Sequence, residues 1–244
     1  MSAFPGLFAG IGLLPQHLAD SIAQVRAFFG DPAGGKIEYG TGFLIRQAGN
    51  RSYLATAAHV LFKRDYGLPV RIEVYLGQRS DSCAKALTIY GQDEPFFVPD
   101  EFTGSNNPPA GSDYGLIRID NDAGSLANFH HFVASSANPV QSIVRLYGYP
   151  KDGINPQSDD PYYTVLEAIP EGTECFSYAH TPDQPAPTAP ATYRGMSGGP
   201  LIGNSSTDRT NRVFGIHTRG DDGIRATRMS ETVRNTMKSW IGAV

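Results

Sequence analysis

Short apolar runs separated by turn-forming residues make up most of the chain. Each run is bounded by Gly, Pro, Asn or Asp, and the runs cover residues 42–45, 53–55, 70–76, 86–90, 116–119, 143–148 and 163–168. Two further apolar clusters follow at residues 201–202 and 213–216. Short apolar runs between turn residues are typical of strands. The pattern therefore predicts an all-β protein.

Two segments at the ends of this region have helical spacing instead. Apolar residues recur three and four positions apart between residues 16 and 29, at Leu18, Ile22, Val25 and Phe29. This spacing predicts an amphipathic helix, which the glycine-rich residues 30–35 end. Near the C-terminus, Ser230 is a candidate N-cap for a helix that continues to Ile241. We expect an N-terminal helical extension over residues 1–35 and a C-terminal helix.

Composition and charge exclude several classes of function. The 20 Lys and Arg residues stand against 24 Asp and Glu residues, so the formal net charge is −4 and nothing indicates nucleic-acid binding. No apolar run is long enough to span a membrane. Residues 4–14 are apolar, but no Lys or Arg precedes them as in a signal peptide. We expect a cytoplasmic protein, with secretion as the alternative.

The length of 244 residues is compatible with a single all-β domain. The proline-rich residues 181–190 are expected to form an extended surface loop, because the apolar pattern resumes directly after them. The chain has two cysteines, Cys83 and Cys175, which allow at most one disulfide and leave its existence open.

Three motifs in the order His, Asp, Ser carry the candidate chemistry. They are residues 56–59 (TAAH), 112–117 (SDYGLI) and 195–200 (GMSGGP). A serine hydroxyl is a poor nucleophile until an imidazole accepts its proton, and the imidazole needs a carboxylate on its other nitrogen. Ser197, His59 and Asp113 can supply these groups, with Asp120 and Asp122 as rival carboxylates nearby.

The glycines beside Ser197 suit a tight turn. Such a turn lets the backbone N–H groups of Gly195 and Ser197 point at one spot, where the oxygen of a tetrahedral intermediate becomes negative. We therefore expect these two groups to form an oxyanion hole.

In order, character and approximate spacing, the three motifs resemble the chymotrypsin-like serine proteases. The resemblance extends from about Gly40 to the C-terminus and implies a protease domain over residues 36–244. It implies two packed six-stranded antiparallel β-barrels, divided near residues 125–140, with the active site between them. It favours Asp113 as the carboxylate, since the family's aspartate precedes a buried strand. A protein or peptide would be the substrate, and no cofactor or metal is implied.

Two positions depart from the family pattern. Met196 occupies the place where trypsin-type zymogens carry an aspartate that pairs with a freed N-terminal amine, so that activation switch is lacking. Ala58 replaces the cysteine that commonly flanks the family's histidine, which agrees with a protease that is poor in disulfides.

Residues 214–220 and 226–235 look like those of the bacterial glutamyl endopeptidases. In that subgroup a histidine at the place of His217 and a hydroxyl residue at the place of Thr192 hold the carboxylate of P1, the substrate residue before the cleaved bond. A buried carboxylate needs such donors to offset its desolvation. The resemblance also places neighbouring residues in the pocket walls, namely Thr218, Arg219, Arg225 and Arg228. An arginine that points inward would strengthen selection of an acidic residue, and the alternative for each arginine is a solvated surface position. It predicts a preference for Glu or Asp at P1.

The sequence is compatible with three other hypotheses. A catalytically silent or latent protease-fold module that only binds a peptide is the alternative function. The protease could also be the effector of a regulated defence or cell-death system with a regulatory partner. A cysteine or metal hydrolase has little support, because neither cysteine lies in a nucleophile-like turn and no His-Glu-x-x-His motif occurs.

Overall fold

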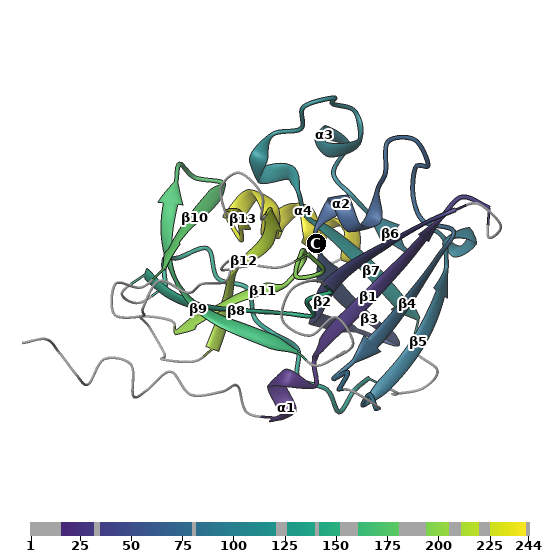
Figure 1. Cartoon of the computed structure of the whole chain (residues 1–244), viewed down its shortest axis with the longest axis horizontal. Coiled ribbons are helices and arrows are strands. Elements are labelled where there is room, and N and C mark those ends of the chain that lie inside the picture. Colours follow the sequence, from purple (N-terminus) through teal and green to yellow (C-terminus); the bar gives the residue numbers. More distant parts are fainter. Residues whose placement is uncertain are drawn as a thin grey trace, which may run out of the picture.

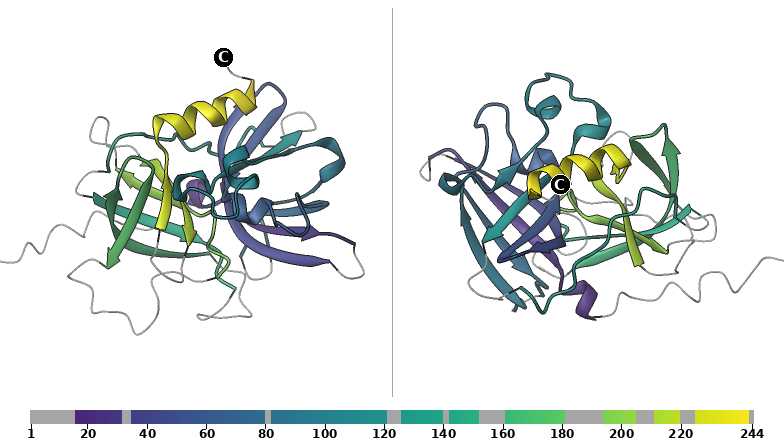
Figure 2. Two further views of the ribbon diagram at one scale, coloured as in Figure 1. Left: turned by 90° about the horizontal axis from the view of Figure 1, so that it is seen from above. Right: turned by 180° about the vertical axis from the view of Figure 1, so that it is seen from behind.

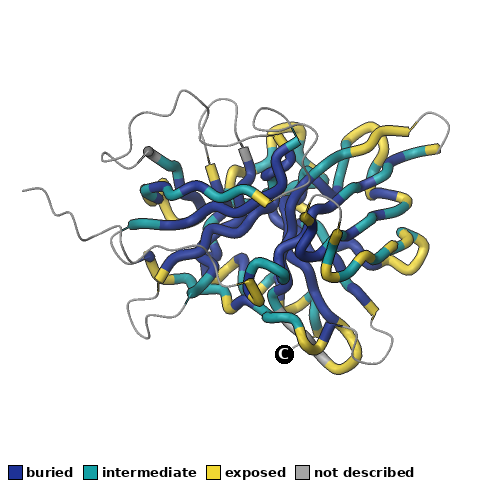
Figure 3. The backbone as a smooth tube through the Cα atoms, turned by 60° about the horizontal axis from the view of Figure 1, so that its bottom comes forward, coloured by how far each residue is buried: buried dark blue, intermediate teal, exposed yellow. Residues whose placement is uncertain are grey.

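The computed structural model describes residues 16–31, 35–79, 82–120, 126–139, 142–151, 161–180, 194–204, 211–219 and 225–242. Two β-rich halves lie side by side, and helix α4 (Glu231–Ile241) extends from one half to the other (Figures 1 and 2). Each half has a buried centre and an exposed rim (Figure 3).

The first half, called here the first sheet, is a curled sheet of seven antiparallel strands in the order β5-β4-β1-β2-β3-β7-β6. Its strands are β1 (Ile22–Phe29), β2 (Lys36–Ala48), β3 (Arg51–Thr56), β4 (Arg71–Leu76), β5 (Lys85–Tyr90), β6 (Phe96–Phe97) and β7 (Gly115–Asp120). Along β4 the buried residues Ile72, Val74 and Leu76 alternate with partly exposed ones, as expected for a strand with one face on the core.

The second half, called here the second barrel, is a closed barrel of six strands in the order β10-β13-β12-β11-β8-β9. Its strands are β8 (Ile143–Gly148), β9 (Tyr162–Glu171), β10 (Cys175–His180), β11 (Pro200–Asn204), β12 (Asn211–Arg219) and β13 (Arg225–Arg228). A compact apolar cluster that includes Phe176, Met196 and Phe214 fills this barrel. The all-β prediction is confirmed, although the first half is a curled seven-stranded sheet and not a closed six-stranded barrel.

The helix predicted over residues 16–29 is wrong beyond its first turn. Helix α1 covers only Gln16–Ala19, and residues 22–29 form strand β1, which pairs with β2 on one side and β4 on the other. β1 is buried at Ile22, Ala23, Gln24 and Val25 in succession, so its apolar positions do not alternate. A strand without alternation cannot be told from a helix by periodicity.

The predicted C-terminal helix is confirmed. The Ser230 hydroxyl accepts a hydrogen bond from the Val233 N–H at 3.3 Å, and Val233 and Met237 are buried. Trp240 near the other end of α4 stacks on Phe97 of the first sheet, with ring centroids 6.0 Å apart. Helix α4 thus links the two halves behind the candidate site.

Candidate active site

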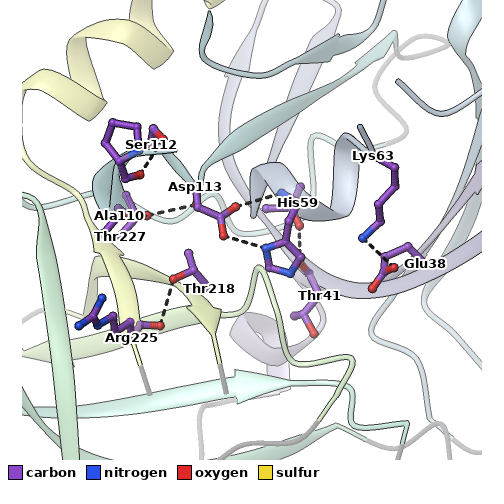
Figure 4. A network of polar contacts seen from close by, with 12 residues as sticks. Glu38, Thr41, His59, Lys63, Ala110, Ser112, Asp113, Thr218, Arg225 and Thr227 are labelled. Carbon is purple, nitrogen blue, oxygen red and sulfur yellow. Dashed lines mark hydrogen bonds and ion pairs between the residues drawn. The ribbon is translucent and has the colours of Figure 1, made fainter. Parts of the chain in front are cut away.

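His59 and Asp113 form a doubly hydrogen-bonded pair in the first half (Figure 4). His59 lies on helix α2 (Ala58–Leu61), directly after β3, and Asp113 follows the 3-10 turn Ala110–Ser112. The His59 Nδ1 atom is 2.8 Å from Asp113 Oδ2, and the His59 backbone N–H donates to Asp113 Oδ1 at 3.0 Å. The carboxylate therefore fixes both the ring orientation and the turn that carries it.

The second barrel also holds the segment that carries Asp113. The Thr227 hydroxyl on β13 donates to the backbone carbonyl of Asp113 at 3.2 Å (Figure 4). Within the segment, the Ser112 hydroxyl donates to the Pro109 carbonyl at 2.7 Å. The rival Asp120 is exposed at the end of β7 and pairs with Arg51, away from His59, and Asp122 lies outside the described residues.

Thr41 of β2 anchors the loop that carries Ser197 to the first sheet. Its N–H donates to the Ser197 carbonyl at 2.7 Å, and its hydroxyl donates to the Gly195 carbonyl at 2.9 Å. The same hydroxyl accepts from the Tyr149 N–H at 3.0 Å. Sequence reasoning missed Thr41; the only signal for it was a threonine between two glycines, Gly40 and Gly42, directly before the apolar run 42–45.

Two glycines give this loop its shape. Gly195 has φ +93° and Gly198 has φ +89°, in the region that side chains rarely adopt. A Cβ atom on Gly195 would also lie 2.5 Å from the Tyr149 carbonyl, and one on Gly198 would overlap the Thr41 carbonyl and the Thr56 hydroxyl. Gly198 therefore brings the Ser197 backbone against the chain that leads into His59.

Several hydrogen-bonding groups around Ser197 have no partner in the described structure. Within the described part of the chain, the N–H groups of Gly195 and Ser197 have no acceptor, and the Ser197 hydroxyl makes no hydrogen bond. The Ser197 side chain is partly exposed. The oxyanion hole stays a prediction, and the described structure has no hydrogen bond between the Ser197 hydroxyl and His59.

His217 is a buried, uncharged histidine on β12. Its exposed fraction is 2%, and burial, followed by the charge of His59, lowers its pKa to about 3. A backbone hydrogen bond at Arg225 and the Asp113 carboxylate act in the opposite direction. The Gly198 N–H donates to the His217 carbonyl at 2.7 Å and the His217 N–H donates to the Gly199 carbonyl at 2.8 Å, so His217 lies beside the loop that carries Ser197.

The His217 Nδ1 atom is buried and has no hydrogen-bond partner in the described structure. The backbone hydrogen bond at Arg225 therefore belongs to Nε2. The ring of Tyr178 lies 6.0 Å from that of His217, and its hydroxyl is also buried without a partner in the described residues. A buried polar group without a partner typically costs about 1–3 kcal/mol. Sequence reasoning missed Tyr178.

The remaining predicted pocket residues differ in where they lie. Thr218 is buried, and its hydroxyl donates to the Arg225 carbonyl at 3.2 Å (Figure 4). The Arg225 side chain is exposed and pairs with Glu171 at 3.4 Å. Its place in the pocket wall stays a prediction. Arg219 belongs to β12 by its backbone, while its side chain and Thr192 lie outside the described residues.

Among the described residues, no cluster of His, Cys, Asp and Glu could hold a metal ion, and both cysteines are free. No helix within that part of the chain is long and apolar enough to cross a membrane.

This arrangement of two β-rich halves around a His–Asp pair is the chymotrypsin-like fold. Residues 40–216 match the family described as the trypsin-like peptidase domain. The match covers more than half of the chain, so the protein belongs to this family. No curated protein sequence matches it.

Solved structures of proteases share the fold at low sequence identity. A Glu endopeptidase in complex with MPD is 16% identical with a TM-score of 0.66, covering 93% of this chain and 94% of the other. A thermostable serine protease, AL20, from an extremophilic microorganism is 14% identical with a TM-score of 0.68, at 93% and 98% coverage. The protease Anisep from Arthrobacter nicotinovorans is 11% identical with a TM-score of 0.66, at 91% and 96% coverage.

Proposed function

We propose that the protein is a serine endopeptidase with Ser197, His59 and Asp113 as its triad. The observation that carries this proposal is the His59 Nδ1 to Asp113 Oδ2 contact of 2.8 Å, because it leaves Nε2 as the base for a serine proton. The family match and the attachment of the Ser197 loop to Thr41 support it.

The reaction proceeds in two steps. Ser197 Oγ attacks the peptide carbonyl carbon while His59 Nε2 accepts its proton, and the N–H groups of Gly195 and Ser197 stabilise the oxyanion. The imidazolium then protonates the leaving amine, which releases the C-terminal product and leaves an acyl-enzyme. Water deprotonated by His59 hydrolyses the ester and restores the serine hydroxyl.

A serine-directed fluorophosphonate probe tests the nucleophile. We expect the parent protein to be labelled and Ser197→Ala to remain unlabelled, because the probe reacts only with an activated serine hydroxyl. Labelling that survives the substitution would contradict the assignment. A folded parent protein that takes up no probe would favour the alternative of a silent or latent peptide-binding module.

The second part of the proposal is a preference for Glu or Asp at P1, with His217 binding the carboxylate. Because Nε2 is used by the Arg225 backbone, His217 must gain a proton on Nδ1 to donate to a carboxylate oxygen. The low pKa of His217 in the empty site means that the acidic substrate binds together with this proton. The KM for substrates with Glu at P1 should therefore rise with pH.

Peptides that differ only at P1 test this preference. We expect kcat/KM for Glu and Asp to exceed that for Ala, Leu and Lys. His217→Gln should lower kcat/KM for Glu by about 10- to 100-fold, the range for one hydrogen bond to a charged group, and spare residual cleavage after apolar residues. A parent protein without acidic preference would contradict the pocket assignment. The role as a defence or cell-death effector stays a prediction.

A further inference from the structure

Two neighbouring rings of the second barrel each carry a buried polar atom without a partner in the described residues. The two atoms are the Tyr178 hydroxyl and His217 Nδ1, and both are inaccessible to solvent and have no hydrogen-bond partner in the described residues. The two rings are 6.0 Å apart and tilted by 35°. Buried polar groups in folded proteins almost always have partners, so a neighbouring pair without any indicates a group that binds between them.

The strand register explains why these two side chains meet. Phe176 of β10 pairs with Ala226 of β13, and Ala226 pairs with His217 of β12. Paired residues on neighbouring strands share a face, and Tyr178 is on the same face as Phe176, two positions away. Ala226 contributes only a methyl group, so β13 puts no large side chain between Tyr178 and His217.

This face of the barrel leads to the candidate nucleophile. Tyr178 packs against the apolar cluster of the second barrel, which contains Met196, the residue directly before Ser197. His217 is coupled electrostatically to His59 and Asp113. The Gly198 N–H donates to the His217 carbonyl at 2.7 Å, so His217 lies against the loop that carries Ser197, and the Tyr178 ring lies beside the His217 ring.

We infer that Tyr178 is a second specificity-determining residue of the P1 pocket, whose hydroxyl donates a hydrogen bond to an oxygen of the P1 side chain that His217 also binds. This inference rests on the proposed protease function. A carboxylate offers two oxygens, so Tyr178 and protonated His217 can each donate to one of them. Burial raises the pKa of Tyr178 well above its usual value, which keeps the hydroxyl protonated and able to donate.

Neighbouring donors are already occupied in the described structure. The Thr218 hydroxyl donates to the Arg225 carbonyl, and the Arg225 side chain is exposed beside Glu171. The Arg228 Nε atom also lacks a partner, but its guanidinium donates to the Ser136 carbonyl and lies over the Phe176 ring. Tyr178 is the group that lies beside His217 with its hydroxyl free.

Peptide binding to the Ser197→Ala protein tests this role without requiring turnover. Three peptides differ only at P1, with Glu, Gln or Met, which have similar length but differ in their oxygen atoms. We expect Ser197→Ala to bind the Glu peptide more tightly than the Met peptide. Adding Tyr178→Phe should weaken Glu binding by about 10-fold, the scale of one hydrogen bond, and leave Met binding unchanged. Tyr163→Phe is the matched control, because Tyr163 stacks on Tyr147 and packs on the other apolar cluster.

The outcomes separate this inference from the proposed function. The role of Tyr178 is overturned if Tyr178→Phe leaves the affinities for the Glu and Gln peptides unchanged relative to the affinity for the Met peptide. Equal weakening of all three affinities is one such result. If the Ser197→Ala protein binds the Gln peptide, but not the Glu peptide, more tightly than the Met peptide, only the acidic preference is contradicted. In that case, loss of the preference for the Gln peptide on adding Tyr178→Phe still supports the role of Tyr178. A folded protein that binds none of the peptides contradicts both proposals.

Discussion

The polar side chains of the two halves of the molecule differ in whether they have hydrogen-bond partners. In the first half the side chains of His59 and Asp113 are bonded to each other, and Asp113 also accepts from the His59 backbone. In the second barrel three atoms are buried without partners in the described residues, namely the Tyr178 hydroxyl, His217 Nδ1 and Arg228 Nε. The groups proposed to transfer protons are thus hydrogen-bonded in the free protein, whereas the groups proposed to select the substrate have no partner until a substrate binds.

This difference has a physical basis. A proton-transferring group works best when its orientation and tautomer are fixed before the reaction, because reorganisation would raise the barrier. A selective pocket gains discrimination from unsatisfied polar groups, since a substrate that cannot pair with them leaves their desolvation uncompensated. The correct substrate pairs with these groups and so removes the desolvation cost that they impose on the free protein.

Asp113→Asn would break the ordered pair and has the largest expected effect. An amide can donate to Nδ1 and so hold His59 in the tautomer that cannot accept the serine proton. We expect kcat to fall by about 10⁴-fold, measured by steady-state hydrolysis of the best peptide of the P1 panel.

The matched control is Asp120→Asn, which changes the exposed carboxylate that pairs with Arg51. It should leave kcat near the parent value, and thermal unfolding should show both variants folded. Equal losses of kcat in the two variants would contradict the assignment of Asp113.

Local chemistry explains why the sequence predicted the candidate catalytic residues. The motifs around His59, Asp113 and Ser197 each combine a reactive side chain with its own turn, and a turn is encoded by adjacent residues. The contact between Tyr178 and His217 depends instead on register across β10, β13 and β12. No local pattern carries that information, so sequence reasoning could not find Tyr178.

Strand β1 shows the corresponding limit for the fold. It lies between β2 and β4 in the first sheet, and its residues 22–25 are buried in succession, so both of its faces are covered there. The remaining spacing of Leu18, Ile22, Val25 and Phe29 coincides with a helical period. Strands β4 and β7 were predictable because turn residues bound their short apolar runs.

The pH dependence of the free energy of unfolding tests whether His217 of the second barrel is buried in its neutral form. The folded pKa of His217 is about 3, below its ordinary value of 6.5, so the unfolded state binds the extra proton between these pH values. His217 therefore stabilises the fold at neutral pH and loses this contribution as pH falls below 6.5. The loss should reach about 3 kcal/mol between pH 7 and pH 4.

Urea unfolding at several pH values measures this effect in the parent and in His217→Gln. The variant should lose less free energy of unfolding on acidification, by about the same 3 kcal/mol. His130 and His131, whose pKa values are also lowered by burial, act equally in both proteins and cancel in the difference. Parallel pH profiles would show that His217 is not buried in its neutral form.

Thr41→Val tests the junction between the two halves. The substitution keeps the shape of the side chain but removes the hydroxyl that donates to the Gly195 carbonyl and accepts from the Tyr149 N–H. Losing these two hydrogen bonds between buried groups should lower the free energy of unfolding by about 2 kcal/mol in urea titrations. Thr88→Val on the exposed side of β5 is the control and should change it little. A loss no larger than the control's would mean that the hydroxyl does not hold the loop.

Ser230→Ala has the smallest expected effect and concerns the helix that links the two halves. The Ser230 hydroxyl caps α4 through the Val233 N–H and donates to Glu174 of the second barrel at 3.0 Å, while Trp240 at the other end packs on the first sheet. Loss of an N-cap typically costs about 1 kcal/mol. Trp240 is the single tryptophan of the chain, so its fluorescence in a urea titration reports on this helix directly.

Ser239→Ala, an exposed position in the last turn of α4, should leave stability unchanged or slightly higher, because alanine favours helix and no cap is lost. If both variants behave alike, the cap does not contribute to holding α4 across the two halves, and its position depends on the apolar contacts of Val233, Met237 and Trp240 alone.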